Sequence, residues 1–177
     1  MNAQDDLRRA ARSIFDTTLA NMDARAAVHN ALNFTGGRLT ILDDEFDLNE
    51  QPLPIYAVAA GKAAGVMASA LDEALGGALA GGVVSAPPAS VGLSERWRVF
   101  AGGHPLPNEA SIEAARAAFT LLRTADAQPR ALVIFLISGG GSAMLEWPRD
   151  ESITLAELRA AHRTLVSCGA SIDEINL

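Results

Sequence analysis

The strongest constraint on the fold is a run of seven apolar residues, 131–137, that ends directly in a glycine-rich segment. The run has the length of a strand and is apolar on both faces, as a central strand of a covered parallel sheet should be. A second apolar run, Ile55 to Ala60, also ends at a glycine. Apolar strands that alternate with amphipathic helices indicate an α/β layered fold with a mostly parallel sheet.

Further elements follow from spacing and capping residues. Two helices are expected before residue 36, the second one capped by Asp23 and ended by Gly36 and Gly37, and the acidic stretch 43–47 is predicted to be a solvated loop. Helices are also predicted over 62–75 and after two capping signals, Asn108 and the Thr154–Glu157 pair. Short strands are expected at 81–85 and 97–101. The inner face of the helix after Asn108 is predicted to carry apolar residues at helical spacing, namely Ile112, Ala115, Phe119 and Leu122.

Composition excludes several classes of protein. The net charge is −7, which argues against nucleic-acid backbones or anionic membranes as main partners. The single cysteine, Cys168, allows no internal disulfide and is expected to be a small buried apolar residue. No apolar run is long enough to span a bilayer, and the N-terminal residues lack the order of a signal peptide. The expected location is therefore the cytoplasm.

The first candidate site follows the strand 55–60. Gly61 lets the chain turn, and a helix that begins at Lys62 presents free N–H groups that suit an anion. Lys62 is the only lysine among fourteen basic residues, and it adds a compact positive charge. The plain alternative is a lysine that extends from a turn into solvent.

The second candidate site is the segment Ser138, Gly139, Gly140, Gly141 and Ser142, which follows the strongest strand. Its glycines expose N–H groups that a phosphate or carboxylate can approach closely. The segment matches neither the dinucleotide fingerprint G-x-G-x-x-G nor the P-loop pattern, and an ordinary tight turn is the alternative.

The third candidate site contains His104, which lies between Gly102-Gly103 and two prolines. The imidazole is suited to a ligand contact or to acid–base chemistry, while the prolines equally suggest a rigid connector. The sequence assigns no metal ligands, because the acidic stretch 43–47 matches no ligand spacing.

The order of these motifs resembles the N-terminal region of the bacterial-type glycerate 2-kinases, whose C-terminal part is called the MOFRL domain. The resemblance is carried, over essentially all 177 residues, by four segments: 58–64, 102–108, 137–143 and 171–176. It implies a Rossmann-like three-layer domain that occupies residues 1–177. It also implies phosphate transfer from ATP to the 2-hydroxyl of D-glycerate, with Mg²⁺ or another divalent cation.

The same resemblance implies roles for the candidate residues. Lys62 matches the active-site lysine of the family, and the segment Ser138 to Ser142 matches a ligand-cradling glycine loop. Gly61 and His104 are predicted to contact the substrate or phosphate together with that loop. Family members are more than twice as long as this chain, and an active-site aspartate and arginine belong to the part that it lacks. We therefore expect the chain alone to be inactive and to leave apolar surface uncovered, which favours a homo-oligomer.

Two other functions remain open at this stage. One is an NAD(P)H-dependent hydroxypyruvate reductase, although G-x-G-x-x-G does not follow any predicted strand. The other is a non-catalytic α/β module that binds an anion or a protein partner.

Overall fold

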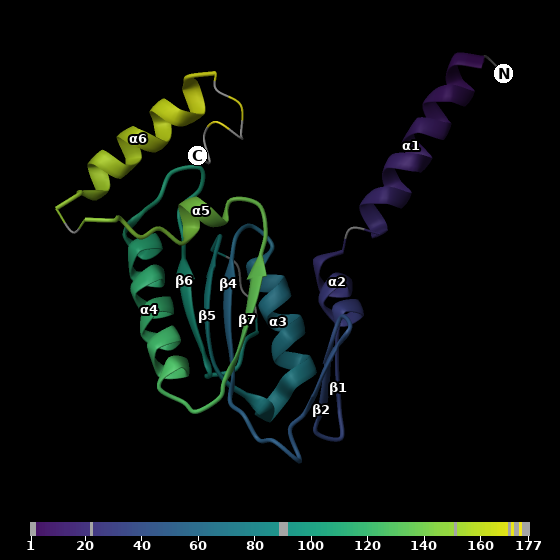
Figure 1. The fold of residues 1–177 in the computed structure, drawn as a ribbon. Coiled ribbons are helices and arrows are strands. Elements are labelled where there is room, and N and C mark those ends of the chain that lie inside the picture. The colour runs from purple at the N-terminus through teal and green to yellow at the C-terminus, as the bar shows by residue number, and fades with distance from the viewer. Residues whose placement is uncertain are drawn as a thin grey trace.

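The computed structural model describes residues 3–21, 23–88, 92–150 and 152–169, together with Ser171 and Glu174. A four-stranded parallel sheet forms the centre of the fold, and a smaller antiparallel sheet precedes it (Figure 1). The elements, in chain order, are α1 (Ala3–Asn21), α2 (Ala24–Ala31), β1 (Leu32–Thr35), β2 (Arg38–Ile41), β3 (Asp44–Asp47), β4 (Ile55–Ala60), α3 (Ala64–Leu75), η1 (Gly76–Ala78), β5 (Leu79–Ala86), β6 (Trp97–Ala101), α4 (Glu109–Asp126), β7 (Leu132–Ile137), α5 (Gly141–Met144) and α6 (Leu155–Ser167).

The parallel sheet lies between two helices, which confirms the predicted three-layer α/β fold. Helix α3 packs against β4, β5 and β7 on one face, while α4 packs mainly against β5 and β6 on the other (Figure 1). Every residue of β4 is buried, and three of the six are alanines, so the sheet is thin enough there for both helices to approach closely.

The strand order is β6-β5-β4-β7, with all neighbours parallel. The chain leaves β4 in one direction to form β5 and β6, and then returns through α4 to add β7 on the other side of β4. The direction of strand addition thus reverses between β4 and β7. In open α/β sheets this reversal point, at the carboxyl ends of the strands, is where ligands bind.

The prediction that 131–137 forms a central strand is wrong. Within the described sheet β7 lies at an edge, and Phe135 and Ile137 are 55% and 60% exposed. The apolar pattern is that of an interior strand, but α4 lies over β5 and β6 and leaves the outer part of β7 uncovered.

The prediction of a loop at 43–47 is also wrong. Gly36 and Gly37 do not end a helix but form the turn of the β1–β2 hairpin, where both have positive φ (61° and 79°), the geometry of a type I′ turn. The acidic stretch supplies β3, which pairs antiparallel with β2. Asp47 accepts the Asn49 and Glu50 N–H groups at 2.9 and 3.3 Å, and these bonds lower the pKa of its carboxyl group.

The predicted helix caps are confirmed. Asn108 and Ser111 form a capping box at the start of α4, and Thr154 and Glu157 form another at the start of α6. The predicted inner face of α4 is only partly right, because Phe119 is 43% exposed and its ring lies tilted against that of Trp147, with the ring centroids 5.0 Å apart. The buried residues on the face that packs on the sheet have mainly small side chains: Ser111, Ala114, Ala115, Ala117 and Ala118.

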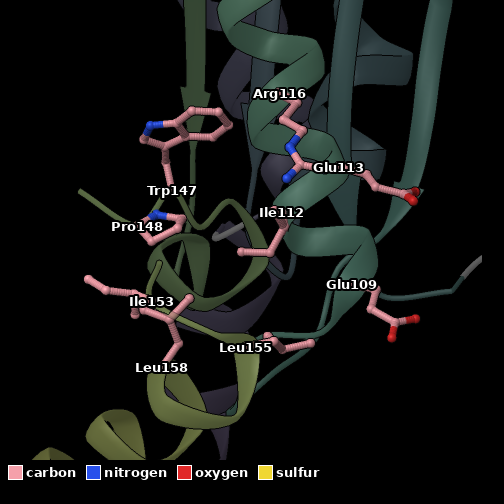
Figure 2. Close-up of a pocket in the computed structure, with 9 residues that line it drawn as sticks. All are labelled: Glu109, Ile112, Glu113, Arg116, Trp147, Pro148, Ile153, Leu155 and Leu158. Atoms are coloured by element: carbon pink, nitrogen blue, oxygen red, sulfur yellow. The ribbon is translucent and has the colours of Figure 1, made fainter. Parts of the chain in front are cut away.

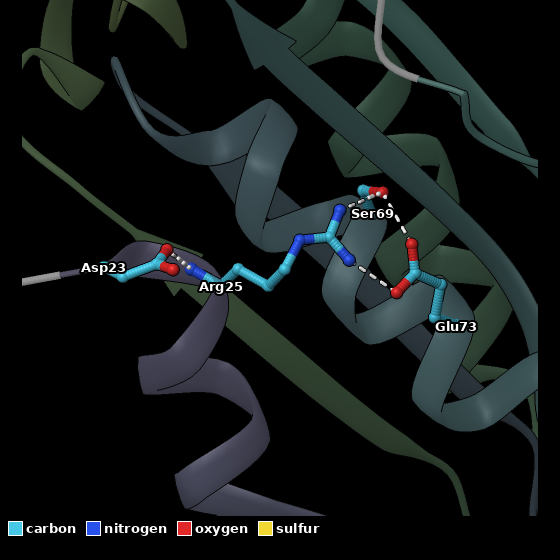
Figure 3. Close-up of polar contacts among 4 residues, drawn as sticks. All are labelled: Asp23, Arg25, Ser69 and Glu73. Carbon is cyan, nitrogen blue, oxygen red and sulfur yellow. Dashed lines mark hydrogen bonds and ion pairs between the residues drawn. The ribbon is translucent and has the colours of Figure 1, made fainter.

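An ion pair ties α2 to α3 (Figure 3). The Arg25 guanidinium binds the Glu73 carboxylate and also donates to Ser69 Oγ at 3.2 Å. The backbone N–H of Arg25 donates to the carboxylate of Asp23, the N-cap of α2, at 2.9 Å. The hydrogen bond and charge of Arg25 lower the pKa of the Glu73 carboxyl group. This cluster holds α2 against α3, the helix that follows β4.

The two terminal helices project from this body (Figure 1). Helix α1 exposes the apolar side chains Leu7, Ile14 and Phe15, and α6 has no buried residue. The prediction that Cys168 is buried is wrong, because it is exposed just after α6. Among the described residues, no helix combines the length and apolarity needed to cross a membrane. The helix expected from Ser171 onward lies largely outside the described residues.

Candidate functional site

The loops at the carboxyl ends of β4 and β7 are joined by hydrogen bonds. The Lys62 N–H donates to the Gly139 carbonyl at 2.9 Å, and the Ala63 N–H donates to Ser138 Oγ at 3.0 Å. In the opposite direction, the Ser138 N–H donates to the Ala60 carbonyl at 3.0 Å. The first two candidate sites of the sequence analysis therefore form one structural unit at the reversal point of the sheet.

Gly61 is where the two loops approach most closely. Its φ is +121°, a conformation that L residues rarely adopt, and a Cβ there would overlap the Ser138 hydroxyl and lie 2.7 Å from the Ser138 carbonyl carbon. Its N–H donates to the Ser85 carbonyl at the end of β5 at 3.1 Å. Because Gly61 has no side chain, the loops after β4 and β7 can lie in contact at this point.

Two of the N–H groups at the start of the predicted helix are already bonded within the protein. Helix α3 begins at Ala64, two residues later than expected, and the N–H groups of Lys62 and Ala63 already bind the 138–139 segment. The Lys62 side chain itself is exposed at this edge. Its ammonium group is thus available to an anion, while the backbone beneath it is fixed.

The free backbone donors lie in the glycine segment. The Gly141 N–H closes a turn onto the Ser138 carbonyl at 3.2 Å, and Gly140 takes a φ of +85°. Among the described residues, no acceptor binds the N–H groups of Gly139 and Gly140. Ser142 is exposed in the short helix α5, one residue further on. Consecutive free N–H groups of this kind suit a phosphate or carboxylate.

His104 also lies against the glycine segment. A Cβ on Gly140 would be 3.3 to 3.4 Å from three atoms of the His104 ring, so the imidazole covers this glycine. The connector that carries His104 is held by the Gly103 N–H, which donates to Ser111 Oγ at 3.0 Å, and by the Asn108 amide, which donates to the Ala101 carbonyl at 2.9 Å. The connector is thus rigid, as one reading predicted, and it brings His104 to the other candidate residues.

The structure brings no obvious metal ligands to this edge. Within the described ranges, no group of three or more His, Cys, Asp or Glu side chains is placed to hold a metal ion. His162 Nε2 on α6 lies at hydrogen-bond distance, 2.8 Å, from the Glu146 carboxylate, and neither residue belongs to the predicted site.

A cavity of about 460 Å³ lies between α4 and the start of α6, and none of the predicted site residues lines it (Figure 2). Its wall is mixed, with Trp147 and Pro148 facing Ile112, and charged side chains lie on the α4 side. This cavity could not be predicted from the sequence, because it depends on how α6 is oriented relative to α4. No local sequence pattern encodes that orientation.

A reversing parallel sheet with glycine-rich loops at its carboxyl edge defines a doubly wound α/β domain of the ligand-binding kind. More particularly, the chain belongs to the family described as "Domain of unknown function (DUF4147)", whose sequence model matches residues 10–177. The family resemblance predicted from the motifs is thereby confirmed.

The relatives of the chain include named enzymes. It is 33% identical over 171 residues to the glycerate 2-kinase of Pyrococcus horikoshii, a match that covers 97% of this chain and 37% of the relative. It is 37% identical over 123 residues to the D-glycerate 2-kinase of Thermotoga maritima, covering 69% of this chain and 29% of that protein. A putative hydroxypyruvate reductase of Agrobacterium vitis is 34% identical over 170 residues, or 96% of this chain and 34% of the relative.

Two solved structures share the fold. A Pyrococcus horikoshii protein matches with a TM-score of 0.77 at 32% identity, covering 96% of this chain and 37% of that one. The glycerate kinase of Thermotoga maritima matches with a TM-score of 0.69 at 31% identity, covering 97% and 37%. The chain thus spans little more than a third of the length of these relatives.

Proposed function

We propose that residues 1–177 form the N-terminal, Rossmann-like domain of an ATP-dependent glycerate 2-kinase, which converts D-glycerate to 2-phosphoglycerate. The supporting observation is the junction of the Lys62 loop with the glycine segment at the reversal point of the sheet. This junction provides a positive charge and free N–H donors in a chain whose relatives include glycerate 2-kinases.

The chemistry suits these residues. Phosphoryl transfer depends mainly on positioning and on neutralising the charge of phosphate oxygens, and bound ATP would supply the transferred group. In this proposal the Lys62 ammonium balances negative charge, and the N–H groups of Gly139 and Gly140 donate to oxygens of the same anion. His104 and Ser142 border the position that this anion would take.

In this proposal, other parts of the active site come from polypeptide outside residues 1–177. The described residues offer no three-ligand metal set, so they do not fit a self-contained Mg²⁺ site, and no step here is routed through the ion. The aspartate and arginine implied by the family resemblance, the MOFRL domain and the second wall of the cleft would lie outside this chain. We therefore expect the chain alone to give negligible turnover.

The second candidate function is reduction of hydroxypyruvate, because the Agrobacterium relative is named a putative hydroxypyruvate reductase. A dinucleotide-binding turn after β4 should read G-x-G-x-x-G, but the segment 61–65 reads Gly-Lys-Ala-Ala-Gly. A non-catalytic, anion-binding module would bind the same ligands without turnover.

The test is a chimera in which residues 10–177 replace the matching part of the Pyrococcus glycerate 2-kinase. With ATP, Mg²⁺ and D-glycerate, a coupled assay for 2-phosphoglycerate should detect turnover well above that of the isolated chain. Oxidation of NADH by hydroxypyruvate would support the reductase instead. A folded chimera that binds ATP and catalyses neither reaction would support the binding module.

A further inference from the structure

Helix α3 lacks an N-terminal cap of its own. The first N–H groups of a helix have no partner within the helix and are usually bound by a Ser, Thr, Asp or Asn side chain at the N-cap. Helices α4 and α6 follow this rule through Asn108 and Thr154. The N-cap residue of α3 is Ala63, which has no side chain able to serve.

Ser138, in the loop after β7, supplies an acceptor for the N–H of the N-cap residue, as the N3 side chain does in a capping box. Its hydroxyl accepts the Ala63 N–H at 3.0 Å, across 75 residues of sequence, and the next carbonyl, that of Gly139, accepts the Lys62 N–H at 2.9 Å. Ser138 is itself fixed on both sides, because its N–H donates to the Ala60 carbonyl and its carbonyl accepts the Gly141 N–H.

We infer that Ser138 is a positioning residue, whose hydroxyl caps α3 and so fixes the backbone that carries Lys62. This inference rests on the proposed function for the role of Lys62. It changes the role that the sequence suggested for Ser138, from a direct ligand of the phosphate to the residue that couples the glycine segment to the lysine. The direct donors are then the Lys62 ammonium and the N–H groups of Gly139 and Gly140.

The coupling has a functional consequence. Residues 138–140 carry the two free N–H donors and the two acceptors that hold the backbone of Lys62 and Ala63. An anion bound to Gly139 and Gly140 therefore acts on a segment that is bonded directly to Lys62. Loss of the Ser138 hydroxyl should weaken this connection, leaving only the Lys62–Gly139 backbone bond, without removing any group that contacts the anion.

The single lysine makes this testable. In protein labelled with ¹³Cε-lysine, Lys62 gives the only lysine side-chain signal, so no assignment is needed. Four proteins are compared: the wild-type chain, Ser138→Ala, Ser138→Thr, which keeps a hydroxyl, and Thr154→Ala, which removes the equivalent cap of the remote helix α6. The probe is inorganic phosphate, and amide hydrogen exchange at Lys62 and Ala63 is measured on the same samples.

For Ser138→Ala we expect amide exchange at Ala63 to rise about fivefold or more, as loss of a helix cap typically allows. The Lys62 signal should move, and phosphate affinity should fall by a similar factor. Ser138→Thr should recover much of both effects, while Thr154→Ala should change neither despite losing a cap. Unchanged Ala63 exchange and an unmoved Lys62 signal in Ser138→Ala would overturn the inference.

The same experiment separates this inference from the proposed function. If phosphate fails to move the Lys62 signal of the wild-type chain, the proposed anion site fails, but amide exchange and the resting Lys62 signal still decide the role of Ser138. If Thr154→Ala perturbs Lys62 as strongly as Ser138→Ala does, the effect is one of general stability, and the positioning role is refuted.

Discussion

The contact between Gly61 and Ser138 predicts a large effect of a single methyl group. In Gly61→Ala, the new Cβ would occupy a residue with φ of +121° and would lie 2.7 Å from the Ser138 carbonyl carbon. Holding an L residue at such a φ costs roughly 1–3 kcal/mol, and overpacking a tight contact costs roughly 1–3 kcal/mol more. We therefore expect a destabilisation of about 2–6 kcal/mol, a large part of the total stability of an ordinary domain.

Gly76→Ala is the matched control. Gly76 also has positive φ, +50°, but a Cβ there would meet nothing within 4 Å. This variant should lose only the conformational part, about 1–3 kcal/mol, because L residues rarely adopt its φ of 50° and ψ of −123°. Urea unfolding followed by circular dichroism gives both free energies of unfolding on the same scale. If the two variants agree within about 0.5 kcal/mol, the Gly61–Ser138 contact does not restrict position 61, and the reasoning is refuted.

Three further predictions concern other parts of the molecule. Lys62→Arg in the active chimera should lose most kinase activity, because a planar guanidinium cannot replace a compact ammonium near phosphate oxygens. Near-normal turnover would make Lys62 peripheral, and Arg12→Lys on α1 is the control. Phe135→Lys should reduce any self-association of the isolated chain seen by sedimentation, because a charged side chain hinders pairing at the free edge of β7. Val99→Lys on the opposite edge strand, β6, should not reduce it, and equal effects would show that β7 is not the contact surface. Because Arg25 lowers the pKa of Glu73 in the folded state, its stabilising effect is full above the unfolded value of 4.5 and is lost as the pH falls through the lower, folded value. Glu73→Gln should therefore reduce the loss of stability between pH 7 and acid pH, and an unchanged pH dependence would show that the pair contributes nothing.

The sequence predicted the layers of the fold because its local signals were strong there. The runs 55–60 and 131–137 are strands, and the caps at Asn108 and Thr154 begin helices where expected. These features depend on a few neighbouring residues, and the tertiary structure did not override them.

The failures have physical causes of a different kind. Gly36-Gly37 was expected to end a helix and the acidic residues of β3 to form a loop, because the pairing of β2 with β1 and β3 joins separate segments that local patterns do not connect. The edge position of β7 follows from strand order, which the apolar pattern of one strand does not encode.

The candidate site shows the same division. The residue types at Lys62 and 138–142 indicated an anion site, but the trans cap from Ser138 to Ala63 could not be predicted, because it joins residues 75 positions apart. Because of these bonds, the N–H groups of Lys62 and Ala63, which were expected to bind an anion, are already bonded within the protein.

The most direct test of the central claim is a titration of the isolated chain with ATP, observed at the Lys62 side chain and at the amides of Gly139 and Gly140. The free donors of this edge should respond together, so all three signals should move along one saturable binding curve, with sodium chloride at equal ionic strength as the control. The account predicts that Lys62→Arg weakens the curve and that amides remote from this edge, such as those of the β1–β2 hairpin, stay unmoved. Signal shifts at Lys62, Gly139 and Gly140 no larger than those caused by sodium chloride would contradict an anion site at this edge. Saturable shifts only at residues around the α4–α6 cavity would also contradict it.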